Sequence, residues 1–259
     1  MGIVQGNLSL YLEAALANGG VGPGLNSPLT TTFKDLSGLG NNGTLTNFGF
    51  TTASGWAGSG TSADPYRLVF DGTNDYVAVP TLHACDDKIF SYEFWFMRSG
   101  APSAIGALAS EANSASANLY PYTLPYIFTD GTPRLQVKDA AGTQVQIICT
   151  VNVCDGAWHH IVGTADGTYM YLYVDGVLKG GPTALPSGAL GPTGWTTVGA
   201  LRANSTPGFW YYLSGGVAVA RIYDRTLSAA EVATNTAAGY TLLPRGGGRF
   251  LRLPGGVIR

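Results

Sequence analysis

The sequence predicts an all-β protein built from antiparallel strands. Glycine (37), proline (14) and tyrosine (14) are abundant among the 259 residues and only 12% of residues are charged, which favours strands and turns over helices. Between Tyr169 and Val174, tyrosines alternate with apolar residues, and this period of two places the two sets on opposite faces of a strand. Asp175-Gly176 then supplies the two positive-φ residues of a type I′ turn. We therefore expect an antiparallel meander here.

Length and charge narrow the class of protein. We expect one large β domain over residues 1–243, because no linker divides the chain and its length is enough to bury a sizeable core. A net charge of −2 gives no global field that would attract nucleic acid or an anionic membrane. No segment approaches the roughly 20 apolar residues that span a bilayer, and residues 1–20 lack the basic and apolar regions of a secretory signal. Nucleic acid and membranes are therefore not expected as partners.

Three cysteines, Cys85, Cys149 and Cys154, leave an odd count that argues against a disulfide framework. Free buried thiols are one interpretation, since cysteine behaves as a small apolar residue. A bridge between Cys149 and Cys154 is the other, because the two flank what looks like a hairpin. No further Cys or His stands at the spacing of a zinc site.

The first half of the chain contains several predicted strands. Residues 8–12 form the first, and residues 68–70 and 76–79 form two more joined by a turn at 71–74. Residues 90–97 are the clearest core strand. Its aromatic residues at alternate positions share one face: Phe90, Tyr92, Phe94 and Phe96. Aromatic residues at this spacing are typical of a core.

Residues 99–133 are small, polar and aromatic, with prolines that interrupt any strand pattern. One interpretation is a long loop that displays Tyr120 and Tyr122 for sugar stacking or protein contact. The other is a loop and an edge strand whose tyrosines pack locally. A hairpin then follows, with strands at 134–138 and 143–148.

A strand at 195–201 leads into a second aromatic segment. Its four consecutive aromatic residues are Phe209, Trp210, Tyr211 and Tyr212. In an extended segment they cannot all point inward, so some must face out. Because aromatic residues are enriched at interface hot spots, this loop is the best candidate for contact with a ligand or partner.

The C-terminal region combines one helix with an extended arm. Ser228 and Glu231 form a capping box that predicts a short helix over about residues 229–236. Residues 244–259 contain arginines without an acid, spaced by glycine and proline, and we expect an arm outside the domain that orders on docking to a neighbour. Its predicted docking residues are Arg245, Arg249, Phe250, Arg252 and Arg259.

Several blocks of sequence together resemble one family. They are residues 35–45, 70–77, 158–164 (WHHIVGT), 171–176 (YLYVDG) and 221–228 (RIYDRTLS). In this order they resemble the laminin-G-like domains of the concanavalin A-like lectin/glucanase superfamily, over roughly residues 7–240. The resemblance implies an antiparallel β-sandwich jelly roll with one short helix near the C-terminus. It also implies that the first strand lies beside residues 217–223.

Two interpretations stand for the motif at residues 35–45. Asp35, Asn41 and Asn42, with Asp71, could supply oxygen ligands to calcium, which takes six to eight such ligands. Alternatively, the motif is a turn held by Asx-type hydrogen bonds. Relatives carry an Asp-Glu pair where this chain has residues 218–220 without a carboxylate, so one candidate ligand is missing. We expect no cofactor, with calcium as the open alternative.

Enzymatic activity is not expected. Glucanases of the resembling fold place carboxylates along one strand, and retaining enzymes need carboxyl groups about 5–5.5 Å apart. Glu93 is flanked on its own face by Ser91 and Trp95, so that pattern is absent. His159 and His160 are expected to be structural residues, because no triad partner is placed by sequence.

Two functions from different classes follow. The first is a structural protein of the virion, namely a bacteriophage capsid decoration, fibre or tail-associated protein that binds other virion proteins and copies of itself, with glycans as further ligands. A sandwich of an exported type without a signal fits a protein released by lysis, and the arm fits assembly. The alternative is a carbohydrate-binding, lectin-type module of a secreted or surface protein.

Overall fold

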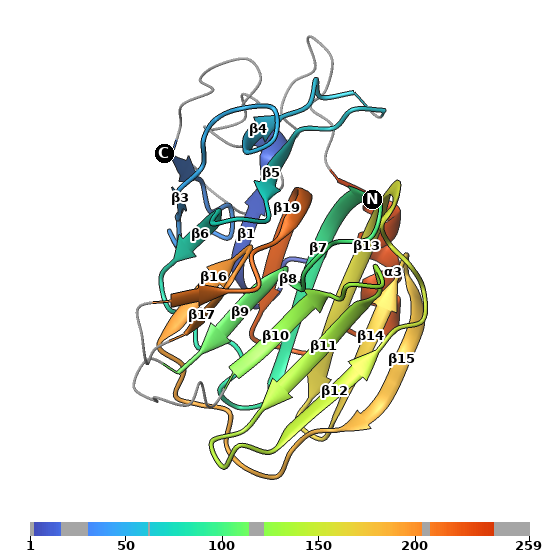
Figure 1. Cartoon of the computed structure of the whole chain (residues 1–259). Coiled ribbons are helices and arrows are strands. Elements are labelled where there is room, and N and C mark those ends of the chain that lie inside the picture. The colour runs from blue at the N-terminus through green and yellow to red at the C-terminus, as the bar shows by residue number, and fades with distance from the viewer. Residues whose placement is uncertain (1–2, 17–30, 62, 114–121, 204–207, 241–259) are drawn as a thin grey trace.

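Two antiparallel sheets packed face to face account for most of the chain (Figure 1). The computed structural model describes residues 3–16, 31–61, 63–113, 122–203 and 208–240. Sheet A runs in the order β15 (Val177–Ala184), β14 (Tyr169–Val174), β13 (Asp155–Asp166), β7 (Ile89–Ser99), β19 (Ser214–Tyr223), β5 (Arg67–Asp71) and β4 (Gly55–Ala57), with β1 (Leu8–Glu13) also paired to β19.

Sheet B forms the second layer. It runs in the order β12 (Gln144–Ile148), β11 (Pro133–Lys138), β10 (Tyr122–Ile127), β9 (Ala109–Ala112), β16 (Trp195–Val198), β6 (Tyr76–Val79), β3 (Gly43–Thr46) and β2 (Thr32–Phe33), with β8 (Gly106–Ala107) paired to β10. Three smaller elements complete the fold: a hairpin of β17 (Leu201–Ala203) and β18 (Gly208–Trp210), the 3-10 turn η1 (Ala14–Leu16), and helix α3 (Ala229–Ala238). The predicted jelly-roll sandwich is confirmed.

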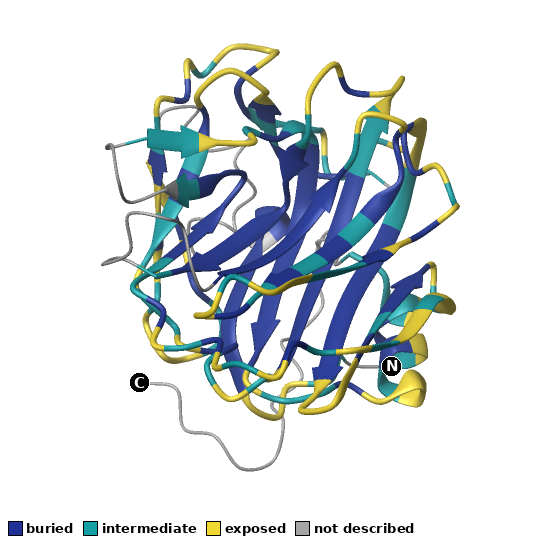
Figure 2. Cartoon of the chain, turned by 60° about the horizontal axis from the view of Figure 1, so that its bottom comes forward, coloured by how far each residue is buried: buried dark blue, intermediate teal, exposed yellow. Residues whose placement is uncertain are grey.

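The core lies between the sheets and follows strand alternation. In β7 the predicted aromatic face points into this core. In β14, Met170, Leu172 and Val174 point inward, whereas Tyr173 packs on the outer face of sheet A. Figure 2 shows the central strands buried and the connecting loops exposed. Burial of apolar surface is the main force that holds the layers together, and it stabilises the fold by roughly 25 cal/mol for each Å² buried.

The predicted pairing of the first strand is confirmed. β1 lies antiparallel to β19, with Leu8 opposite Tyr223 and Glu13 opposite Val219. The meander at 155–184 is also present, since β13, β14 and β15 pair in sequence. Its Asp175-Gly176 turn has φ of 51° and 78° at the two residues, as a type I′ turn requires.

The strands predicted at 68–70 and 76–79 are confirmed as β5 and β6, and the turn between them crosses from sheet A to sheet B. One strand prediction is corrected. The strand predicted at 195–201 breaks at Gly199, which has φ of 87°. A Cβ there would lie 2.2 Å from the Phe70 ring, so only glycine fits this approach of the backbone to the core.

The helix confirms the capping-box prediction. The Ser228 side chain accepts from the Glu231 N–H, and the Glu231 carboxylate accepts from the Ser228 N–H at 2.9 Å. The helix extends two residues beyond the predicted end at 236 and packs Val232 against the outer face of sheet A. None of the described helices is long and apolar enough to cross a membrane.

The three cysteines are free and buried, as one of the two interpretations predicted. Burial raises the pKa of all three thiols. Raised pKa values keep the groups protonated and poorly nucleophilic near neutral pH. They serve as packing residues.

Candidate ligand-binding face

The outer face of sheet B carries three rows of polar and aromatic side chains across β10, β11 and β12. Strand alternation turns Leu135 and Val137 into the core and leaves every second residue on the outer face. The rows, read across the register of the three strands, are Tyr122, Lys138 and Gln144; Leu124, Gln136 and Gln146; and Tyr126, Arg134 and Ile148. This face is rich in groups that can hydrogen-bond to hydroxyls.

Hydrogen bonds between the rows fix the side chains in position. The Gln136 amide donates to the Tyr122 hydroxyl, which in turn donates to Oε1 of Gln144 at 3.4 Å. The Tyr126 hydroxyl donates to Oε1 of Gln146 at 2.9 Å. Gln144 is exposed and Gln146 is half-buried. The phenols therefore preorganise amides that a ligand can reach, which lowers the entropy cost of binding.

The predicted contact residues do not include these glutamines. The signal that identifies them is the alternation of polar and apolar residues in the hairpin at 134–138 and 144–147. Such alternation is typical of a strand pair with one face on the core and one face toward solvent.

Tyr122 lies in this array and not in a displayed loop, so the loop interpretation is wrong for residues 122–127, which form β10. Its side chain is buried, with 7% of its surface exposed. Pro125 is tolerated inside the strand because it lies between two pairings on the same edge of β10. Residues 122–123 pair with β9, and residues 126–127 pair with β8. At that gap no N–H is required, while the Pro125 carbonyl still accepts from Leu108 N–H at 2.9 Å.

The second aromatic segment lies at the edge of the same face. Phe209 stacks on Tyr76 of β6 with ring centroids 3.9 Å apart, and Tyr212 lies 6.5 Å from Phe209. Trp210 and Tyr211 are 45% and 40% exposed. The prediction that some of these four aromatic side chains face out is confirmed.

Contacts with sheet B hold this segment against the array. The Arg202 guanidinium of β17 stacks on the Trp195 ring of β16 at 3.1 Å from its centroid. Ala107, which pairs with Tyr126, donates its N–H to the Tyr211 carbonyl at 2.7 Å. Burial raises the pKa of Tyr126, and the neighbouring Tyr211 adds to that rise. The structure therefore brings the aromatic segment together with the residues of β10.

Some predicted contact residues lie outside the residues that the structure describes. These are Tyr120 and the docking arm with Arg245, Arg249, Phe250, Arg252 and Arg259. Their roles stay predictions.

The Asp35 motif is a loop closed by side-chain hydrogen bonds. The Asp35 carboxylate accepts from the N–H groups of Tyr11 at 3.0 Å, Ser37 at 2.9 Å and Asn41 at 2.8 Å. The Ser37 hydroxyl adds a further bond at 2.6 Å, and Asn42 Oδ1 accepts from the Asp35 N–H at 2.8 Å. These contacts match the Asx-turn interpretation, since the carboxylate lone pairs are engaged within the loop.

Asp71, the fourth predicted calcium ligand, does not join that loop. It ends β5, and its carboxylate accepts from Thr73 N–H at 2.7 Å in the turn between the sheets. Across the described ranges, no group of three or more His, Cys, Asp or Glu residues gathers as a metal site.

Glu93 is the centre of a buried polar cluster between the outer face of sheet A and α3. The carboxylate accepts from Arg221 at 2.6 Å and from the Tyr223 hydroxyl at 3.0 Å. It also lies 2.9 Å from His160 Nε2 and accepts from Asn235 of α3 at 2.9 Å. Burial raises the pKa of Glu93, but the Arg221 charge and the His160 hydrogen bond outweigh it and hold the pKa at about 2. Glu93 has no exposed surface, so it acts as a structural ion-pair partner.

Comparison with known proteins agrees with this architecture. The family Laminin_G_3, described as the concanavalin A-like lectin/glucanases superfamily, matches residues 71–233, which is more than half of the chain. No curated protein matches the chain by sequence.

Several solved structures share the fold. The binding domain of Paraclostridial Mosquitocidal Protein 1 has a TM-score of 0.61 and 17% identity, covering 90% of this chain and 52% of its own. Domain 4 of AbnA, a GH43 extracellular arabinanase from Geobacillus stearothermophilus solved with arabinotriose, has a TM-score of 0.59 and 16% identity, with coverage of 89% and 98%. The Ruminococcus gnavus IT-sialidase CBM40 with α2,6-sialyllactose has a TM-score of 0.50 and 15% identity, with coverage of 57% and 83%. The chain thus spans about half of the mosquitocidal binding domain, and these identities show the fold alone.

Proposed function

The chain belongs to the concanavalin A-like lectin/glucanases superfamily, and from that premise we propose that it is a carbohydrate-binding module whose ligand lies along the outer face of sheet B. The observation that carries the proposal is the fixed array of glutamine amides and tyrosine hydroxyls beside two exposed aromatic rings. A glycan chain offers hydroxyls along its edges and C–H groups on its ring faces. The glutamine amides can hydrogen-bond to the hydroxyls, and the aromatic rings can pack against the C–H groups.

Fold relatives support this choice of ligand. The AbnA domain, which matches nearly the whole of this chain, was solved with arabinotriose, and the CBM40 was solved with sialyllactose. Proteins of the same fold thus bind oligosaccharides of different composition. A module of a secreted or surface protein is the setting that agrees best with these relatives.

The proposal is for binding without catalysis. Glu93 and Glu111, which lie on neighbouring layers of the sandwich, are fully buried and bonded within the protein. Glu111 accepts from Cys85 N–H at 2.9 Å and from the Tyr92 hydroxyl at 3.0 Å. Neither carboxylate is placed to reach a glycosidic bond on the candidate face. A role in a virion stays a prediction, and glycan binding is compatible with it.

Affinity measurements on a single tyrosine test the proposal. Tyr211 has φ of 55°, so Tyr211→Asn removes the ring while keeping a residue that tolerates this backbone conformation. Calorimetric titration with arabinan, β-glucan and sialylated oligosaccharides should detect at least one ligand. The variant should bind that ligand about fivefold to tenfold more weakly, since an aromatic contact is worth about 0.5–1.5 kcal/mol beyond its buried area.

A matched control is the exposed Tyr169, which is 42% exposed on β14 of sheet A. Tyr169→Asn should leave affinity unchanged. Equal losses in the two variants, or no binding of any glycan by the unmodified protein, would contradict the proposal.

A further inference from the structure

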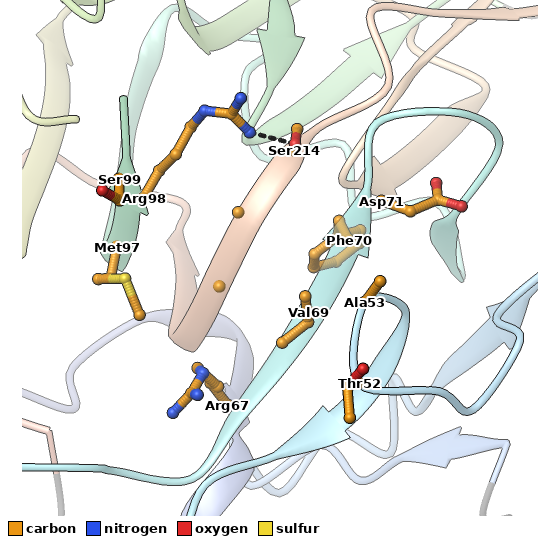
Figure 3. A pocket seen from close by; sticks show the side chains of 12 residues that line it. Thr52, Ala53, Arg67, Val69, Phe70, Asp71, Met97, Arg98, Ser99 and Ser214 are labelled. Atoms are coloured by element: carbon orange, nitrogen blue, oxygen red, sulfur yellow. Dashed lines mark hydrogen bonds between the residues drawn. The ribbon is translucent and has the colours of Figure 1, made fainter. Parts of the chain in front are cut away.

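The outer face of sheet A contains a trough where three strands meet, on the sheet opposite the candidate face. The trough has a volume of about 400 Å³ and is lined by residues of β5, β7 and β19 (Figure 3). Its volume lies within the roughly 300–1,000 Å³ of small-molecule sites. It is therefore large enough for one or two sugar rings.

Glycine in β19 creates the trough. Val69, Gly216 and Met97 form one row across β5, β19 and β7. The centre of this row has no side chain, so Val69 and Met97 form two walls about 10 Å apart, which is two strand spacings. A Cβ on Gly216 would lie 2.8 Å from Cδ of Arg67, so a side chain at this position would fill the floor.

One guanidinium at the trough is held by neutral oxygens. The Arg98 Nε donates to the Gly100 carbonyl at 2.9 Å, and its Nη1 donates to the Ser214 hydroxyl. In Figure 3 the Arg98 side chain reaches from β7 to Ser214 at one end of the trough. These bonds fix the orientation of the guanidinium, and no carboxylate of the described residues forms an ion pair with it.

The remaining polar groups differ in character. Arg67 lies toward the opposite end, and its charge is paired with Asp64 at 2.6 Å. Asp71 is the register partner of Ser214 at the rim of the trough, and its carboxylate accepts from the Thr73 N–H in the adjoining turn. Thr52 supplies a hydroxyl from the facing loop. The trough therefore combines the Arg98 guanidinium, which forms no ion pair with a described residue, with two hydroxyls and two apolar walls.

We propose that this trough binds an acidic sugar, a pyranose that carries a carboxylate, with the carboxylate on the Arg98 guanidinium. The planar fork of arginine matches a carboxylate in a way that no hydroxyl does. The Ser214 and Thr52 hydroxyls of the lining bond to the sugar hydroxyls, and the ring lies between Val69 and Met97 over the floor at Gly216. The site lies on a different sheet from the candidate face, so it does not depend on the proposed function.

Calorimetric titration with matched sugars tests the inference. The ligands are trigalacturonate and its methyl ester, and α2,6-sialyllactose and lactose, which distinguish a uronate from a sialic acid. At least one acid should bind about tenfold or more tightly than its neutral counterpart, because charge-assisted hydrogen bonds are about twice as strong as neutral ones. Arg98→Gln should abolish this preference.

Control variants locate the effect. Arg98→Lys keeps the charge but loses the fork and should retain part of the preference, while Lys179→Gln, an equal charge change on exposed β15, should retain all of it. Tyr211→Asn should also retain it. Thermal unfolding of Arg98→Gln confirms that the variant is folded. Absence of acid binding, equal affinity for acid and neutral sugar, or a preference that survives Arg98→Gln would overturn the inference, and a preference lost only in Tyr211→Asn would place the acid on sheet B instead.

Discussion

The two outer faces of the sandwich carry similar polar groups but use them in different ways. On sheet A, the charges of Glu93 and Arg221 are fully buried beneath α3, and their hydrogen bonds are made within the protein. On sheet B, Gln144 and Gln146 remain within reach of solvent and are oriented by tyrosine hydroxyls. Helix α3 covers the Glu93 cluster and makes it part of the fold. No described helix covers the glutamines of sheet B, so they remain available to a ligand.

This comparison explains why polar residue types alone do not identify a site. A buried ion pair contributes little net stability, yet it is costly to break, because removal of one partner leaves an uncompensated charge in a low-dielectric interior. A surface amide costs little to remove, and its value appears only when a ligand is bound. Stability and affinity measurements should therefore separate the two faces.

The largest effect is expected at the buried pair. Glu93→Gln leaves Arg221 without its partner at 2.6 Å, and Glu13 at 3.9 Å is a poor replacement. The free energy of unfolding should fall by about 3–5 kcal/mol, as measured by urea denaturation. Asp64→Asn, which breaks the exposed pair with Arg67, should cost less than about 1 kcal/mol. Similar losses in both variants would refute the distinction.

A second prediction concerns acid. The pKa of Glu93 falls from its ordinary value of 4.5 to about 2 in the folded protein, so its contribution to stability is present above about pH 4.5 and is lost as the pH falls toward 2. The loss should be on the order of 3 kcal/mol. Unfolding curves at several pH values should show this slope, and Glu93→Gln should flatten it. An equally steep slope in the variant would assign the acid sensitivity to other groups.

The exposed face should behave in the opposite way. Gln146→Ala should change the free energy of unfolding by less than about 1 kcal/mol, since its side chain is half-buried and accepts one hydrogen bond, from the Tyr126 hydroxyl, among the described residues. The same change should weaken glycan binding about fivefold, by loss of a hydrogen bond worth about 0.5–1.5 kcal/mol. Denaturation and calorimetric titration on one preparation give both values. A large loss of stability with unchanged affinity would make this face structural.

The smallest effect is expected from removal of metal. Because the Asp35 carboxylate is occupied by N–H and O–H donors, a chelator should shift the thermal midpoint by less than about 1 °C. A ligand that binds only the folded protein must stabilise it, so a shift of several degrees would show that the loop holds calcium. Added calcium after chelation is the control.

Much of the fold is predictable because strand alternation and turn chemistry are local. The Asp175-Gly176 turn, the capping box at Ser228 and the aromatic face of β7 are all written in neighbouring residues. The crossing of β5 and β6 to different sheets is not local, because a turn of the same composition can close a hairpin or connect two layers.

The candidate face was only partly predictable for the same reason. The exposure of Trp210 and Tyr211 follows from four aromatic residues in an extended run. The position of Tyr122 in a strand does not follow from the sequence, because the nearby Pro125 suggests a loop. Pro125 fits within β10 only because it lies at the gap between β8 and β9, where no N–H is needed for pairing. The trough depends on the row that pairs Val69 with Gly216 and Met97, which no single strand reveals.

The most direct test of the central claim is chemical-shift mapping of a bound glycan. The protein, labelled with ¹⁵N, would be titrated with whichever of the two neutral ligands of the calorimetric panel, arabinan or β-glucan, binds more tightly. The account predicts that the perturbed amides cluster on β10, β11 and β12 and on residues 209–212, with little change around Glu93 beneath α3. Perturbations centred on sheet A, or spread without a cluster, would contradict the assignment of the outer face of sheet B as the binding face.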